Sequence, residues 1–268
     1  MVLSKSNNAA GNSQLDSFIW IRLLGGFALF KEGTPVLMSA GTKAEALLSL
    51  LAIHHNDGLS REALIHLLWP DQETMLAIQS LNTLTSSLRR QLGSPPKGTS
   101  WISYDGETYQ INHTVGVGID ILHFDYLVEL GNQEWHRCNY GKAIESYDLA
   151  LKFYHGDLRN GLDIYAVIER ERLRASYLNV LACLANYYFD QHLYAMSLDH
   201  AQRLIAKDPC REDAHRLMMR CYVYQGQRAQ ALRHYHFCQS VLNTEFAIAP
   251  EMATTALYEK IRQTPESI

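Results

Sequence analysis

The second half of the chain repeats itself with a period of 34 residues, and this period restricts the fold more than any other feature. Five positions recur at that spacing: Tyr188, Ser197, Ala201, Leu204 and Pro209 correspond to Tyr222, Ala231, Tyr235, Cys238 and Asn243. Small residues at this period are typical of tetratricopeptide helix hairpins, whose helices pack closely. The repeat therefore predicts an all-α, tetratricopeptide-like domain.

An earlier copy of the same pattern lies further upstream. Ala143, Tyr147 and Ala150 stand 54 residues before Ser197, Ala201 and Leu204. The extra spacing predicts an insertion of about 20 residues between the first two units. The insertion includes residues 155–158 and the start of a helix near Tyr165.

The first hundred residues follow a different pattern. Residues 18–30 read FIWIRLLGGFALF and are rich in strand-forming residues, residues 32–35 form a turn pattern, and residues 36–38 resume an apolar run. Such alternation of apolar runs and turns predicts a small antiparallel sheet. We expect strand structure to end near Gly118.

Three helices and a hairpin are expected after this sheet. The first helix spans about 42–54, the second starts after the N-cap Ser60 and ends at Trp69 before Pro70, and the third spans 74–92. Two short strands, 101–104 and 108–111, flank an Asp-Gly turn. This order is that of a winged helix-turn-helix.

The third helix has two chemically different faces. Four leucines and one threonine recur at helical spacing and should face the core: Leu81, Leu84, Thr85, Leu88 and Leu92. The opposite stripe carries amides, hydroxyls and a guanidinium: Gln79, Asn82, Thr83, Ser86 and Arg90. Amides and guanidinium groups can pair with base edges in the major groove, and hydroxyls suit phosphate oxygens. A solvated amphipathic helix is the alternative explanation of this stripe.

The local charge supports contact with nucleic acid. The whole chain carries a formal net charge of −4, but no Asp or Glu lies between Thr74 and Tyr104, where Arg89, Arg90 and Lys97 contribute +3. A local positive patch is what meets a phosphate backbone. Lys43 is a weaker candidate, because a lone exposed lysine is usually only solvated. The wing residues Thr108 and Tyr109 are also weaker, because Asp105 and Glu107 lie in the same hairpin.

Other classes of protein lack their defining patterns in this sequence. No apolar stretch reaches membrane-spanning length, and residues 1–16 read as a disordered arm without a signal peptide. Five dispersed cysteines without a CxxC pair indicate a reducing, cytoplasmic setting. Neither a nucleotide-binding loop nor a catalytic constellation is found, and the histidines do not have metal-ligand spacing. We expect neither an enzyme nor a cofactor.

Long motifs in both halves resemble one family. They are IRLLGGFALFKEGTPV, TKAEALLSLLAIH, LSREALIHLLWPD and SLNTLTSSLRRQLG in the first half, and GIDILHFDYLV, YHGDL, ERERLRASYLNVLACLA, KDPCREDAHRLMMRCYVYQGQRAQALRHYHFC and AIAPEMATTALYEKIR in the second. The sequence resembles the SARP regulators (Streptomyces antibiotic regulatory proteins), which join an OmpR-type winged helix to a bacterial transcriptional activator domain. The expected division is an arm over 1–16, a winged helix over 17–113 and the activator domain over 119–268.

The resemblance implies a cytoplasmic transcription activator that binds direct repeats in promoter DNA, often as a dimer, and contacts RNA polymerase. It places the recognition helix at 79–92, with Asn82, Thr83, Ser86, Arg89 and Arg90 toward DNA, and it matches Lys43 to a basic position. Ser87 stands where the family usually has an Arg that touches DNA. The residues expected at the DNA interface are Lys43, Gln79, Asn82, Thr83, Ser86, Ser87, Arg89, Arg90, Thr108 and Tyr109.

A second function remains open at this point. The helical repeats could bind a peptide, a partner protein or a small signalling molecule, because repeat surfaces commonly do so. The winged helix would then bind DNA weakly or serve as a protein-docking surface. The acidic net charge and Ser87 favour this sensor or adaptor function.

Overall fold

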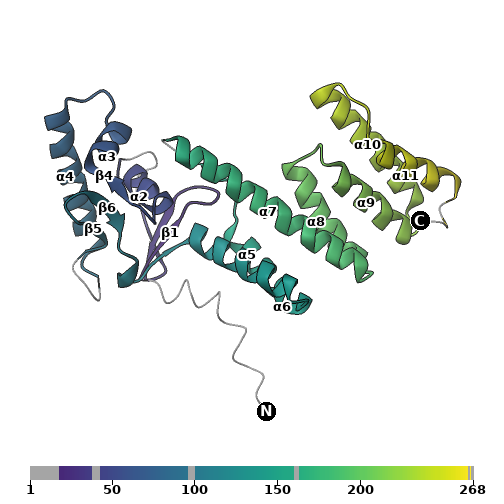
Figure 1. Cartoon of the computed structure of the whole chain (residues 1–268), viewed down its shortest axis with the longest axis horizontal. Helices are drawn as coiled ribbons and strands as arrows, with labels where there is room; N and C mark the ends of the chain where they lie inside the picture. The colour runs from purple at the N-terminus through teal and green to yellow at the C-terminus, as the bar shows by residue number, and fades with distance from the viewer. Residues whose placement is uncertain (1–17, 38–42, 96–99, 160–162, 265, 267–268) are drawn as a thin grey trace, which may run out of the picture. The chain divides into compact units, whose positions relative to one another are not determined.

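The computed structural model describes residues 18–37, 43–95, 100–159, 163–264 and 266. The chain forms two compact units, residues 1–174 and 175–268, and their boundary falls inside helix α7 (Ile164–Asp190; Figure 1). The domains predicted from the sequence were divided where the sequence pattern changes, whereas these two units are divided by packing. The predicted domain boundary at 113–119 therefore stays a prediction. The predicted N-terminal arm and Lys97 lie outside the described residues.

The first unit begins with a small sheet whose strand order is β3-β2-β1-β7. Strands β1 (Ile19–Arg22), β2 (Ala28–Lys31) and β3 (Thr34–Val36) pair antiparallel, with Trp20 opposite Phe30 and Phe30 opposite Pro35. The predicted antiparallel sheet is confirmed. The turn is shorter than expected, because Thr34 and Pro35 already belong to β3 and only Glu32 and Gly33 have positive φ.

The sequence analysis missed the fourth strand of this sheet. Strand β7 (Val117–Ile119) lies parallel to β1 and leads directly into helix α5 (Asp120–His136). The sequence analysis assigned no strand after Ile111, although the limit that it set for strand structure, near Gly118, falls within this segment. The two glycines in the segment VGVG weaken the local strand pattern. The residues that pair with this strand, Ile19 and Ile21 among them, lie about 98 positions earlier in the chain.

A helix-turn-helix and a hairpin follow the sheet, as predicted. The elements are α2 (Lys43–Ile53), β4 (Leu59–Ser60), α3 (Arg61–Leu68), α4 (Thr74–Leu92), β5 (Ile102–Tyr104) and β6 (Thr108–Ile111). The Ser60 hydroxyl caps α3 by accepting a hydrogen bond from the Ala63 amide at 3.1 Å. Strand β6 pairs with both β4 and β5, so the wing is anchored beside the start of α3.

A buried junction connects this sheet to the helices that follow; we define it as residues 23–25, Asp120 and residues 155–158. The Asp120 carboxylate accepts hydrogen bonds from the amides of Leu23 (2.9 Å), Leu24 (2.7 Å) and Ile121 (2.9 Å). The side chain is almost fully buried. Burial raises the pKa of Asp120 to about 6, although the three N–H donors favour the ionised form.

The opposite side of the junction is the YHGDL segment. Gly25 donates from its amide to the Asp157 carbonyl at 3.3 Å, and Leu24 forms a β-bridge with Leu158. Gly25 has φ +86°, and a Cβ at this position would lie 2.9 Å from the His155 carbonyl carbon. Only glycine satisfies both the backbone angle and this close approach. The motif IRLLGG and the motif YHGDL are therefore two halves of one contact.

The remaining helices form hairpins at the predicted period. They are α5, α6 (Tyr140–Phe153), α7, α8 (Tyr194–Lys207), α9 (Glu212–Tyr224), α10 (Arg228–Phe246) and α11 (Met252–Gln263). Each of the three hairpin turns places one residue in the left-handed region: Cys138, His192 and Gly226. These residues show the predicted spacings of 54 and 34. The repeat prediction is confirmed, and the insertion contains the junction segment and the start of α7.

The predicted repeat positions form the helix contacts. Ala143, Ala150, Ser197, Ala201 and Ala231 are all buried. Within the second unit, α8 packs on α9, α9 on α10, and α11 on both α9 and α10. No helix in the described ranges has the length and apolarity that a bilayer crossing requires.

Candidate nucleic-acid interface

Helix α4 separates its residues into the two faces that its sequence predicts. Leu81, Thr85, Leu88 and Leu92 are buried and Leu84 is half-buried. The Thr85 hydroxyl is satisfied inside the helix, since it donates to the Leu81 carbonyl at 3.0 Å. Core contacts thus fix which side of α4 faces outward.

The outward side of α4 consists of exposed polar residues, and we call it the polar face: Gln79, Asn82, Thr83, Ser86, Ser87 and Arg90. The Thr83 hydroxyl donates to the Gln79 carbonyl at 2.8 Å, which lies within the same helix. Across the described segments, no hydrogen bond or ion pair joins a carboxylate to any of these side chains. Apart from the Thr83 hydroxyl proton, the polar face therefore keeps its side-chain donors available to a ligand.

Two predicted interface residues have their charged groups occupied elsewhere. The Lys43 ammonium donates to the Leu68 carbonyl at the C-terminal end of α3. The Arg89 guanidinium donates from Nε to the Ser100 hydroxyl at 3.1 Å, and its Nη2 lies 3.5 Å from the Ile102 carbonyl oxygen. Both contacts join separate segments of the chain. In each, a cationic side chain approaches a backbone carbonyl that is left free at the end of a helix or the start of a strand.

The wing is shaped by Asp105, whose acidity the sequence analysis counted against DNA binding. Its Oδ1 accepts hydrogen bonds from the amides of Glu107 (2.9 Å) and Thr108 (2.8 Å), and its Oδ2 from the Thr108 hydroxyl (3.1 Å). These donors, led by the Thr108 amide, lower the pKa of Asp105. The carboxylate thus forms the hairpin turn, and Thr108 remains half-exposed beside it.

Burial removes Tyr109 from the accessible surface. Its residue exposure is 4%, it pairs with Leu59 across β4 and β6, and its ring stacks on Tyr104 with centroids 4.4 Å apart. A strand residue that points into the core cannot also reach a DNA groove. The expectation that Tyr109 contacts DNA is therefore not carried into the proposal below.

The sequence analysis missed Arg61 as a member of this region. Its guanidinium lies over the Tyr104 ring, 5.0 Å from the centroid, at the first residue of α3. The pKa of Arg61 is raised, mainly by a hydrogen bond with the Tyr109 side chain. No sequence pattern pairs residues 61 and 104, because the contact depends on how β6 joins β4 and β5.

The second unit holds a polar pair that could suggest a metal. His215 Nδ1 lies 3.0 Å from His234 Nε2, and His215 Nε2 lies 2.8 Å from the Pro209 carbonyl. Burial, together with the smaller effect of the neighbouring His215, lowers the pKa of His234 to about 4. The structure describes no group of three or more His, Cys, Asp or Glu ligands within the ranges given above. The pair is thus a hydrogen-bonded contact between α9 and α10.

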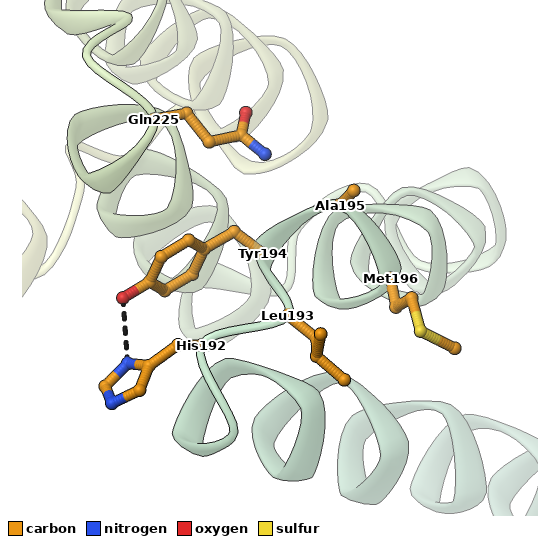
Figure 2. Close-up of a pocket in the computed structure, with 6 residues that line it drawn as sticks. All are labelled: His192, Leu193, Tyr194, Ala195, Met196 and Gln225. Carbon is orange, nitrogen blue, oxygen red and sulfur yellow. Dashed lines mark hydrogen bonds between the residues drawn. The ribbon is translucent and has the colours of Figure 1, made fainter.

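A shallow cleft of about 310 Å³ lies at the hairpin turns of the second unit. Figure 2 shows its residues, which come from the turn after α7, the start of α8 and the end of α9: His192, Leu193, Tyr194, Ala195, Met196 and Gln225. Tyr194 stacks on Tyr224 with centroids 5.1 Å apart, and its hydroxyl lies 3.0 Å from His192 Nδ1. The aromatic side chains give the cleft a fixed apolar wall.

Comparison with known proteins places this fold in a family. The model of the bacterial transcriptional activator domain matches residues 119–262, which is more than half of the chain. The chain therefore belongs to the family of SARP-type regulators that carry this domain.

The relatives extend over nearly the whole chain. Transcriptional regulatory protein MoaR1 of Mycobacterium tuberculosis is 23% identical over 95% of this chain and 83% of its own length. Regulatory protein DnrI of Streptomyces peucetius is 25% identical over 92% of this chain and 93% of its own. Both relatives are regulatory proteins, and MoaR1 is a transcriptional one.

A solved structure shares the fold. Mycobacterium tuberculosis EmbR, solved in complex with a low-affinity phosphopeptide, superposes with a TM-score of 0.73 at 21% identity. The match covers 94% of this chain and 68% of that one. The predicted fold class is confirmed: an α+β winged helix-turn-helix region precedes an all-α, tetratricopeptide-like domain. The chain is a transcriptional regulator of this family.

Proposed function

We propose that this regulator binds double-stranded DNA in a sequence-dependent way through the polar face of α4. The observation that carries the proposal is that this face is exposed, contacts no carboxylate of the described residues and lies on the second helix of a helix-turn-helix. Asn82 and Gln79 offer amides that can pair with adenine, and Arg90 offers a guanidinium for guanine or phosphate. Thr83, Ser86 and Ser87 offer hydroxyls for phosphate oxygens or base edges.

The wing supplies a second, weaker contact in this proposal. Thr108 is half-exposed beside the turn that Asp105 builds, where a hydroxyl or a backbone amide can reach a phosphate. Lys43 contributes only through donors that its contact with Leu68 leaves free. The expectations from the family resemblance complete the proposal: direct repeats in promoter DNA, a dimer on DNA, contact with RNA polymerase, activation of transcription and a cytoplasmic location.

A mobility-shift titration with the regulator's own upstream DNA tests this proposal. Replacing Asn82 or Gln79 with alanine should weaken specific binding by about 1–3 kcal/mol, roughly five- to 150-fold. Arg90→Ala should also weaken binding to unrelated DNA, because phosphate contacts are independent of sequence. The matched control is Asn243→Ala, which removes an exposed amide from α10 in the second unit. Equal affinities for the unmodified chain and all four variants, with no change in promoter output, would reject the proposal.

The cleft beside Tyr194 favours a second candidate function, the binding of a peptide or small molecule. It offers an aromatic wall and the exposed Leu193 and Met196 side chains, which suit an apolar ligand group. A thermal-shift screen of the full chain against short peptides tests this function. Phosphopeptides belong in that screen because EmbR was solved with one. A ligand whose stabilisation survives Met196→Glu would not occupy this cleft.

A further inference from the structure

Two arginines from different helices hold the two ends of strand β5. Arg89, in the last turn of α4, reaches Ser100 and Ile102 at the start of the strand, with the distances given above. Arg61, the first residue of α3, covers the face of Tyr104 at the end of the strand. Strand β5 comprises only residues 102–104, so each end has its own arginine.

From this geometry we infer that Arg61 and Arg89 are positioning residues that fix the wing relative to α4, and that Arg89 is not a phosphate contact. The inference rests on the proposed DNA-binding function and refines it. It also reverses the role that the family resemblance implies for Arg89, which was expected to face DNA.

The guanidinium group suits this role for physical reasons. It presents donors in a rigid plane and stacks on aromatic rings, so one side chain can fix both a distance and an orientation. Arg61 Nε is buried, without a hydrogen-bond partner among the described residues, and the guanidinium lies over the face of Tyr104. Tyr104 in turn stacks on the buried Tyr109, and its hydroxyl donates to the Gly106 carbonyl at 2.6 Å. The contact therefore extends from α3 through the wing to the core.

Arg90 provides a matched comparison within the same helix. It is adjacent to Arg89 and similarly exposed, but in the described part of the chain no contact with its guanidinium is found. One arginine is thus occupied by the wing and its neighbour is available to a phosphate. Fixing the wing matters because the helix and the hairpin must meet DNA together, and a mobile wing would lose entropy on binding.

The test uses the full chain with Arg61→Met, Arg89→Met and Arg90→Met, which remove the charge and keep much of the side-chain volume. The first measurement is amide hydrogen exchange without DNA. The reporter is the Asn112 amide, which donates to the Trp101 carbonyl at 2.9 Å and closes the hairpin. Arg61→Met and Arg89→Met should speed its exchange by about two- to fivefold, as the loss of one such contact predicts. Arg90→Met should leave it unchanged, and amides of α2 serve as the internal reference for folding.

The second measurement is the dependence of DNA affinity on salt. Arg90→Met should reduce the slope of log K against log salt by about 0.9, the loss of one phosphate contact. Arg61→Met and Arg89→Met should weaken binding by about two- to fivefold with the slope unchanged. A slope reduced by Arg89→Met, with unaltered Asn112 exchange, would overturn the inference. Absence of DNA binding by the unmodified chain would reject the proposed function instead, while the exchange data would still decide whether the arginines hold the wing.

Discussion

The polar face of α4 and the buried junction around Asp120 are both built from polar groups, but they use them in opposite ways. In the junction, every oxygen of Asp120 accepts a hydrogen bond from a backbone amide, and the side chain is almost inaccessible. On α4, the amides and the Arg90 guanidinium are exposed and contact no carboxylate in the described ranges. Buried polar groups that are hydrogen-bonded within the protein hold a fold together, whereas exposed groups, which are bonded only to water, are free to bind a ligand.

This contrast predicts different consequences of mutation. Changes in the junction should act on stability, and changes on the polar face should act on binding alone. The four predictions below test that division, beginning with the largest expected effect.

Asp120→Ala should be the most destabilising of these changes. It would leave the amides of Leu23, Leu24 and Ile121 without their acceptor in a buried site. Each unsatisfied buried donor costs about 1–3 kcal/mol, so we expect a loss of roughly 3 kcal/mol or more in the free energy of unfolding. Urea denaturation followed by circular dichroism measures it. Asn82→Ala is the matched control from the polar face, and similar stabilities for the two variants would break the comparison.

Gly25→Ala should rank second. Its new Cβ would lie 2.9 Å from the His155 carbonyl carbon and would also require an unfavourable φ of +86°. Gly33→Ala is the control, since Gly33 has a similar φ of +73° but nothing within 4 Å of the added carbon. We expect about 1 kcal/mol for the backbone angle alone at Gly33 and roughly 2–4 kcal/mol at Gly25. If thermal unfolding showed that Gly25→Ala and Gly33→Ala lose the same stability, the close contact with the YHGDL segment would contribute nothing to the effect.

The pH dependence of stability should reveal the junction carboxyl. The pKa of Asp120 is raised from its ordinary 3.8 to about 6 in the folded chain, so the folded state binds the proton more tightly than the unfolded state does. The resulting stabilisation is fully present below about pH 4 and is lost as the pH rises through about 6. Asp120→Asn cannot titrate, so the unmodified chain should gain roughly 2–3 kcal/mol relative to this variant between pH 7.5 and pH 4. A pH-independent difference between the two proteins would contradict the assignment.

A pair of threonines on α4 should give the smallest effect and the sharpest test. Thr85 and Thr83 both donate to the carbonyl four residues earlier, at 3.0 and 2.8 Å, but Thr85 is buried and Thr83 is exposed. Thr85→Ala should lower the free energy of unfolding by about 1 kcal/mol through lost packing. Thr83→Ala should change stability by less than about 0.5 kcal/mol and should weaken DNA binding. The reverse pattern would mean that the two faces of α4 were assigned incorrectly.

Local patterns allowed much of this structure to be predicted. The bounds of α4, the Ser60 cap and the spacing of the helix hairpins follow from periodicity over a few turns, because burial on one side of a helix repeats along the chain. The same reasoning separated the buried Leu81 and Leu88 from the exposed Asn82 and Arg90. It could assign faces, but not the partners of individual side chains.

Only the tertiary structure decided how distant polar groups are paired. Strand β7, the contacts of Asp120 with residues about 97 positions away, and the directions of Arg61 and Arg89 all depend on which segments the fold brings together. A carboxylate or guanidinium has the same local sequence signature whether it is solvated, binds a ligand or satisfies a backbone group. The sequence by itself therefore determined the helices, their faces and the family, and the fold decided which charged groups are structural and which are free, because that choice depends on three-dimensional neighbours.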